Sequence, residues 1–133
     1  DQLSGPSAVI VVAGVLLIAD FWNHRILQME LGAPTAEVCF GGSGRGDGLD
    51  QLSGPRDLAF DRGHLYIADW GNDRILQVLL NGSVAEEYSE CWEVVDSKAK
   101  PSDQQLHWPR GIIFHSGHLH VADSENHRIL MAH

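Results

Sequence analysis

The 133-residue sequence predicts an all-β fold built from three repeated units. The repeated string is Asp-x-x-Asn-x-Arg-Ile-Leu, which occurs as ADFWNHRIL at 19–27, ADWGNDRIL at 68–76 and ADSENHRIL at 122–130. Short runs rich in Val, Ile, Leu and Tyr flank each copy, and Gly, Asn and Pro separate them, which is typical of β-strands. The repeated asparagines Asn23, Asn72 and Asn126 are 49 and 54 residues apart (72 − 23 and 126 − 72), so each unit has room for four strands.

Each unit is expected to run through the same strands in the same order. The first strand follows a proline, the second ends at the repeated Asp, and the third begins at the repeated Arg. The expected first strands are 8–12, 57–61 and 111–115, and the second strands are 16–20, 65–69 and 119–123. The expected third strands are 25–30, 74–80 and 128–133, with weaker fourth strands at 36–40 and 87–95. The units are placed at 1–49, 50–102 and 103–133, and the last lacks its outer strand.

These strings resemble a known repeat. The NHRIL segment, the GGSGRGDG loop at 41–48 and a Leu-x-x-Pro step before the first strand are similar to NHL repeats, and the similarity covers nearly the whole chain. The resemblance implies four-stranded blades of a β-propeller, for which six blades are the usual closed form. The expected fold is therefore a partial propeller of three NHL-type blades, half of a six-bladed ring. The resemblance leaves function open, because NHL propellers include RNA-binding and protein-binding modules, sensor domains and a peptide-amidating lyase.

Three blades would leave two apolar blade faces open to water. Each open face would cost several kcal/mol, at roughly 25 cal/mol per Å² of apolar surface. Two arrangements would cover these faces. In the first, the chain is part of a longer propeller, which the absence of an initial Met and an ending within the third blade favour. In the second, the chain closes as a three-plus-three homodimer.

Composition narrows the class of partner. The net charge of −9 disfavours nucleic acid, because an acidic chain repels phosphate backbones. The richest apolar run, 8–19, is too short to cross a bilayer. Cys39 and Cys91 are too few for a disulfide framework and are expected on the outer strands of neighbouring blades. The compartment stays open, with a lean towards the inside of the cell.

The repeated string is interpreted as scaffold rather than as a catalytic set. Asp20 is expected to accept backbone N–H groups across the turn, and Asn23 is expected to take the left-handed conformation. Arg25 is expected to reach a carboxylate, for which the next blade is one candidate. His24 is replaced by Asp73 in the second copy, which argues against a required general base.

Three histidines form the one candidate metal group. If Ser116 and Gly117 form a two-residue hairpin turn, His115 and His118 are cross-strand neighbours, and His120 shares their face. Three imidazoles on one face are a zinc ligand set, and polar packing between blades is the alternative. The expected outcome is no metal and no cofactor.

Residues that are not repeated indicate where partners bind. In a propeller, the strand 2–3 and strand 4–1 connections share one face. The residues expected there are Phe21, Trp22, Trp70 and Trp108, with Arg56 and Arg110 near the mouth of the central channel. Trp and Arg dominate protein-binding hot spots, although each Trp is also suited to covering its own blade. The polar segment 94–106 lies in the same connections. A second, apolar contact is expected at Val12, Ala13 and Val15, which form an unusually apolar hairpin tip.

The sequence therefore predicts a non-catalytic protein-binding or scaffold module within a longer chain or a larger assembly. Its partners are expected to be proteins, with acidic groups near the two arginines, or the remaining blades of the same propeller. The alternative is a metal-dependent propeller enzyme, a lyase or hydrolase, whose site is completed by other blades. Nucleic-acid binding ranks third.

Overall fold

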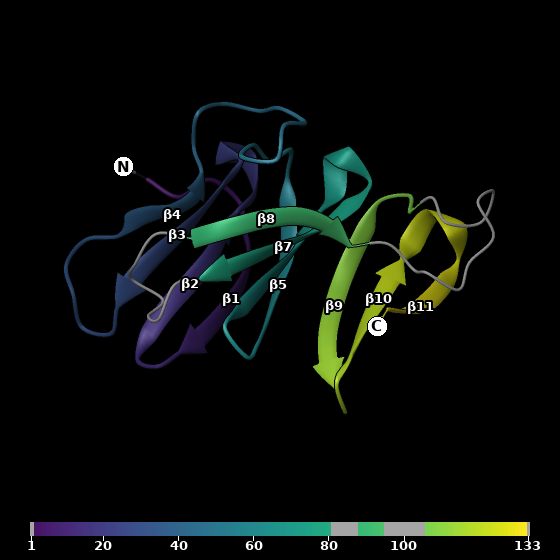
Figure 1. Cartoon of the computed structure of the whole chain (residues 1–133). Helices are drawn as coiled ribbons and strands as arrows, with labels where there is room; N and C mark the ends of the chain where they lie inside the picture. The colour runs from purple at the N-terminus through teal and green to yellow at the C-terminus, as the bar shows by residue number, and fades with distance from the viewer. Residues whose placement is uncertain (1, 81–87, 95–105, 133) are drawn as a thin grey trace.

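The computed structural model describes residues 2–80, 88–94 and 106–132, and strands dominate them (Figure 1). Three antiparallel sheets follow one another along the chain, ordered β1-β2-β3-β4, β5-β6-β7-β8 and β9-β10-β11. We call them blade one, blade two and blade three. Within each sheet, every strand pairs with its neighbour in sequence, which confirms the all-β prediction.

The strands lie close to their predicted positions. Blade one contains β1 (Pro6–Val12), β2 (Val15–Asp20), β3 (Arg25–Glu30) and β4 (Glu37–Gly41). Blade two contains β5 (Pro55–Asp61), β6 (His64–Asp69), β7 (Arg74–Leu80) and β8 (Tyr88–Val94). Blade three contains β9 (Pro109–His115), β10 (His118–Asp123) and β11 (Arg128–Ala132). Short 3-10 turns, η1 (Phe21–Asn23), η2 (Trp70–Asn72) and η3 (Ser124–Asn126), join the second and third strands. Most of the polar segment 94–106 lies outside the described residues.

The first hairpin of every blade has a two-residue turn. The turn residues are Ala13-Gly14, Arg62-Gly63 and Ser116-Gly117, and both members of each pair have positive φ. That combination defines the type I′ turn, whose twist matches the twist of paired strands. The turn also fixes the register, so that His118 lies opposite His115 as predicted.

Blades pack face to face through two apolar clusters. The first lies between blades one and two, and its fully buried members include Leu17, Phe40, Leu65, Ile67 and Leu76. The second joins blades two and three through residues such as Tyr66, Ile75, Ile112, Leu119 and Val121. The first strand of each blade also contacts the first strand of the next, β1 with β5 and β5 with β9.

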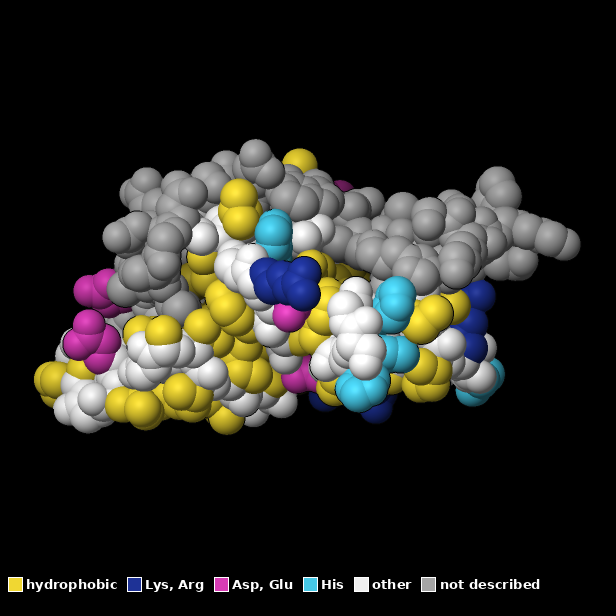
Figure 2. Space-filling model, turned by 60° about the horizontal axis from the view of Figure 1, so that its bottom comes forward, with side chains coloured by type: hydrophobic (Ala, Val, Ile, Leu, Met, Phe, Trp, Pro, Cys, Tyr) yellow, Lys and Arg dark blue, Asp and Glu magenta, His cyan; other side chains and the backbone are white. Residues whose placement is uncertain are grey.

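The outward faces of the two end blades expose apolar side chains. Val9 and Val11 are each 59% exposed on β1, and Ile113 and Ile129 are 63% and 70% exposed in blade three. Figure 2 shows one face of the molecule, on which hydrophobic side chains and a group of histidines reach the surface. The open blade faces expected from sequence are therefore present.

The apolar hairpin tip of blade one differs from expectation. Val12 and Val15 are half-buried and pack against the first core cluster, so only Ala13 of this group is exposed. Strand alternation explains the difference, because it turns Val12 towards blade two and Val11 away from it. Among the described residues, no helix is long and apolar enough to cross a membrane.

Candidate binding face at the blade turns

The repeated Asp, Asn and Arg form the same hydrogen-bonded cluster in each blade. In blade one, Asp20 Oδ1 accepts the Ser4 N–H at 2.7 Å, and Oδ2 accepts Asn23 Nδ2 and Arg25 Nε at 2.8 Å each. The matching groups in the other blades are Ser53, Asp69, Asn72 and Arg74, and His107, Asp123, Asn126 and Arg128. All three carboxylates are fully buried. This geometry supports the interpretation of the string as scaffold.

Blade two shows how the cluster holds the chain that enters it. Arg74 donates to the carbonyl oxygens of Asp47, Gly48 and Gln51 at 2.8–2.9 Å. Asn72 Nδ2 donates to the Gly46 carbonyl at 2.7 Å. The glycine-rich loop between the blades is therefore fixed by the blade that follows it.

Two details of the predicted turn are wrong. Asn23 lies inside η1, and the left-handed residue is the next one, His24, with φ of 52°. From this position the Asn23 side-chain amide donates to Asp20 Oδ2 at 2.8 Å and to the Gln2 carbonyl at 3.1 Å. The carboxylate partner of Arg25 is Asp20 of the same blade, because the short turn brings their side chains within hydrogen-bond distance.

The environment of Asp20 favours its ionised form. Burial raises the pKa, but the hydrogen bonds from Ser4, Asn23 and Arg25, with the Arg25 charge, outweigh burial and leave the pKa below its usual value of 3.8. The carboxylate is therefore charged at neutral pH and serves as a fixed acceptor.

The left-handed residue after each turn links one blade to the next. His24 Nδ1 accepts the N–H of Gly54 at 3.0 Å, and Asp73 Oδ1 accepts the N–H of Trp108 at 2.9 Å. Both donors directly precede the proline that begins the next blade. We call this hydrogen bond the blade joint. The joint at His24 requires a neutral imidazole, and burial together with the Arg45 charge lowers the pKa of His24 below 6.5, against the opposing charge of Asp69.

Acidification should therefore weaken the first joint. Because the folded pKa of His24 is below the unfolded value near 6.5, the unfolded chain binds more protons there, and stability falls as pH drops through about 6.5. The loss should be about 0.5–1.5 kcal/mol, the usual worth of one hydrogen bond. The check is urea unfolding at several pH values for wild type and His24→Asp, which copies the acceptor Asp73. Equal pH dependence in the two chains would contradict the assignment.

Aromatic side chains from three blades form a continuous row on the turn face. Ring centroids are 4.7 Å apart for Phe21 and Trp22, 5.6 Å for Phe21 and Trp70, and 4.9 Å for Trp70 and Trp108. The guanidinium of Arg56 lies 4.8 Å from the Phe21 ring centroid and 5.5 Å from that of Trp70. We call Phe21, Trp22, Trp70 and Trp108 the aromatic row.

The members of the aromatic row differ in how much of the side chain is exposed. Phe21 is only 6% exposed and supports its neighbours, whereas Trp22 is 65% and Trp108 is 37% exposed. Trp22 and Trp108 are thus the members of the row that offer most surface to a partner.

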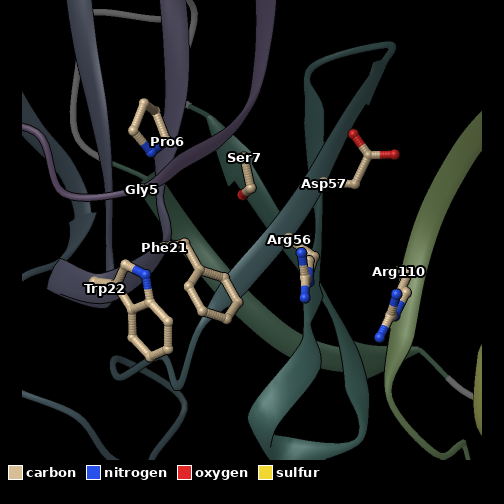
Figure 3. A pocket seen from close by; sticks show the side chains of 8 residues that line it. All are labelled: Gly5, Pro6, Ser7, Phe21, Trp22, Arg56, Asp57 and Arg110. Atoms are coloured by element: carbon tan, nitrogen blue, oxygen red, sulfur yellow. The ribbon is translucent and has the colours of Figure 1, made fainter.

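A cavity of about 500 Å³ lies beside the row. Its lining comes from the starts of all three blades and from η1: Gly5, Pro6, Ser7, Phe21, Trp22, Arg56, Asp57 and Arg110 (Figure 3). Arg56 is the second residue of β5, and Arg110 is the second residue of β9. The structure therefore brings the two predicted arginines to one cavity. Within the described ranges, neither has a carboxylate partner, and Arg56 Nε is buried without a hydrogen bond.

Sequence reasoning missed Asp57 as part of this cavity. Asp57 Oδ1 accepts the Leu58 N–H at 2.9 Å, and Oδ2 accepts the Ile112 N–H of blade three at 2.8 Å. Its carboxylate is therefore engaged with backbone rather than with the arginines. A comparison of the three blade starts reveals the position, because Ala8 and Gly111 stand in its place.

Sequence reasoning also missed the strained backbone of Trp108. Its φ is 55°, whereas the equivalent residues are Gly5 and Gly54, with φ of 62° and 67°. A bulky residue in this conformation is a genuine outlier, and such strain concentrates at functional sites. Trp108 keeps it while placing its ring against Trp70, which supports a binding role for the row.

The three candidate metal ligands lie on the outward face of blade three. His118 pairs with His115, and His120 follows two residues later, so all three share a face as predicted. The rings of His115 and His120 are 6.5 Å apart between centroids. In the part of the chain that the structure describes, no three His, Cys, Asp or Glu side chains are placed to hold a metal ion.

Comparison with known proteins defines the fold as a partial β-propeller. No family model and no curated protein sequence matches the chain. Among solved structures, an auxiliary nutrient binding protein from Bacteroides thetaiotaomicron is similar, with a TM-score of 0.71 and 16% identity over 90% of this chain and 35% of the other. A nidogen/laminin complex gives a TM-score of 0.69 and 17% identity over 98% of this chain and 43% of the other. The chain thus spans less than half the length of either structure, and identities this low show the fold alone.

Proposed function

We propose that this chain is a non-catalytic protein-binding module of the NHL-repeat type, which docks a protein segment bearing acidic groups. The observation that carries the proposal is the cavity in which Arg56 and Arg110 lie without a carboxylate partner among the described residues, beside the exposed tryptophans of the aromatic row. The three blade boundaries at 1–49, 50–102 and 103–133 belong to the same proposal.

Arg56 is well placed to bind a carboxylate. Contacts with the rings of Phe21 and Trp70 restrict its side chain, so little entropy is lost when a ligand binds. A guanidinium donates two parallel hydrogen bonds to a carboxylate, and bonds to charged groups contribute about 1.5–3 kcal/mol each. Asp57 opposes the two arginine charges, but both its oxygens already accept backbone N–H groups.

The surroundings favour a protein ligand over a nucleic acid. The net charge of −9 repels a phosphate backbone, while a local pair of arginines suffices for one or two carboxylates. Exposed Trp22 and Trp108 supply apolar area beside the charges, as in the hot spots of protein interfaces. One structural neighbour is a complex of two proteins and the other a nutrient-binding protein, which is compatible with a binding role.

The test is selection from a displayed peptide library on the immobilised chain. Selected peptides should be enriched in Asp and Glu or in free C-terminal carboxylates, and Gln or amide versions should bind more weakly. Arg56→Gln and Arg110→Gln should each weaken binding by about tenfold or more if they are hot spots. Arg62→Gln is the matched control, because Arg62 is exposed at a hairpin tip and does not line the cavity.

The outcomes separate two kinds of failure. Selected peptides without acidic enrichment would overturn the carboxylate preference. Equal binding by wild type, Arg56→Gln and Arg110→Gln would overturn the cavity as the docking site.

A further inference from the structure

Each end of the chain carries one half of a blade joint. At the C-terminal end, His127 has φ of 53° and occupies the position of His24 and Asp73. At the N-terminal end, Gly5 precedes Pro6 as Gly54 precedes Pro55. In the described residues the His127 side chain and the Gly5 N–H have no hydrogen bond, whereas both internal counterparts are joined.

The two free halves are made of the same residues as the joint between blades one and two. That joint places the Leu-Ser-Gly-Pro segment of 52–55 on the Asn-His-Arg-Ile-Leu turn of 23–27. The N-terminal end repeats Leu-Ser-Gly-Pro at 3–6, and the C-terminal end repeats Asn-His-Arg-Ile-Leu at 126–130. The geometry that His24 and Gly54 adopt inside the chain is therefore available to His127 and to Gly5 of another copy.

Apolar faces accompany both halves. The leading face, on blade one, exposes Val9, Val11 and Val38 at 59%, 59% and 48%. The trailing face, on blade three, exposes Ile113, Ile129 and Met131 at 63%, 70% and 40%. None of these six side chains carries a charge. The trailing face also carries His115, His118 and His120, whose polar ring nitrogens need hydrogen-bond partners in the contact.

The sizes of the side chains on the two faces are complementary. Where blades two and three direct Phe60 and Phe114 towards the preceding blade, the leading face has the smaller Val11. Where blade two offers the small Ala59 to its neighbour, the trailing face has the larger Ile113. The leading face thus has a smaller side chain, and the trailing face a larger one, than the matching positions inside the chain. Together they fill a similar volume, as close packing requires.

We infer that the trailing face of one copy binds the leading face of a second copy, with His127 Nδ1 accepting the N–H of the second copy's Gly5. Two copies make this contact twice, head to tail, and close into a ring. This assembly goes beyond the proposed function: the open sheet faces make the contact, and of the joint residues only Gly5 also lines the cavity.

Light scattering after size exclusion tests the ring in the 133-residue chain. The expected mass is twice the 14.6 kDa of one chain. Val11→Asp on the leading face and Ile129→Asp on the trailing face should each raise the dimer dissociation constant by about tenfold or more, since each places a charge in both contacts. Leu49→Asp is the control, because Leu49 is exposed in the connection between blades and lies on neither face.

Mixing the two variants gives a result that misfolding does not reproduce. A pair of Val11→Asp and Ile129→Asp chains has one contact with both charges and one with none, so the mixture should contain more dimer than either variant alone. His127→Ala should weaken the dimer, and His127→Asp should restore it, as Asp73 does inside the chain. A monomer at every concentration, a dimer that both face variants leave unchanged, or open assemblies larger than a dimer would overturn the proposal.

Discussion

Replacing Arg74 with alanine should lower the free energy of unfolding by about 3–5 kcal/mol, because it leaves the Asp69 carboxylate buried without its counter-charge. Asp69 is fully buried, the Arg74 side chain is only 7% exposed, and Arg74 Nε lies 2.8 Å from Asp69 Oδ2. The substitution also removes the donors to three carbonyl oxygens of the entering loop. Urea unfolding followed by circular dichroism measures the change.

The other two blades supply matched controls for this prediction. Arg25 and Arg128 make the same ion pair, but their side chains are 12% and 28% exposed. Water reaches a more exposed pair and screens it, so the loss should decrease from Arg74→Ala through Arg25→Ala to Arg128→Ala. If Arg128→Ala cost as much as Arg74→Ala, burial would not be the controlling factor.

Replacing Phe40 with alanine should cost about 3–5 kcal/mol, because it opens a cavity between blades one and two. Phe40 is 1% exposed and is the largest of the fully buried side chains that the structure describes. It belongs to the cluster that also contains Leu17 and Leu65, so its loss removes contacts on both sides of the boundary. The measurement is the midpoint of denaturant unfolding, with an unchanged slope as evidence that the unfolding reaction is the same.

Phe60 provides the comparison within the same cluster. It is only half-buried at the edge of the cluster, so Phe60→Ala removes fewer contacts and should cost clearly less. Equal losses from the two substitutions would show that the boundary between the blades can collapse around the Phe40 cavity.

Strands and hairpins could be predicted because their determinants are local. A Gly between two apolar runs, as at Gly63, indicates the turn, and the two-residue turn defines the register. The 3-10 turn could not be placed in the same way. Nothing in the string distinguishes a left-handed Asn23 from a left-handed His24. In the structure the Asn23 side chain donates to Asp20 and to the distant Gln2 carbonyl, and neither contact can be read from the sequence.

The candidate site was predictable only in part. The aromatic row and the two arginines could be named as candidates because they lie in connections that share one face and because Trp and Arg dominate protein-binding hot spots. Asp57 was missed because its role depends on a neighbouring blade, where its Oδ2 accepts the Ile112 N–H. The blade joint was hidden as well, because His24 and Asp73 differ in chemical type yet perform the same role as acceptors.

The Asp cluster also explains how the connections between blades can differ in length. In every blade the carboxylate holds a backbone N–H located 16 residues before it, at Ser4, Ser53 or His107. The position of the segment that enters a blade is therefore fixed by the Asp of that same blade, and not by the preceding blade. The repeats are spaced by 49 and 54 residues, yet the separation of 16 residues is the same in all three blades. Each blade thus sets the position of its own entering segment, whatever the length of the connection before it.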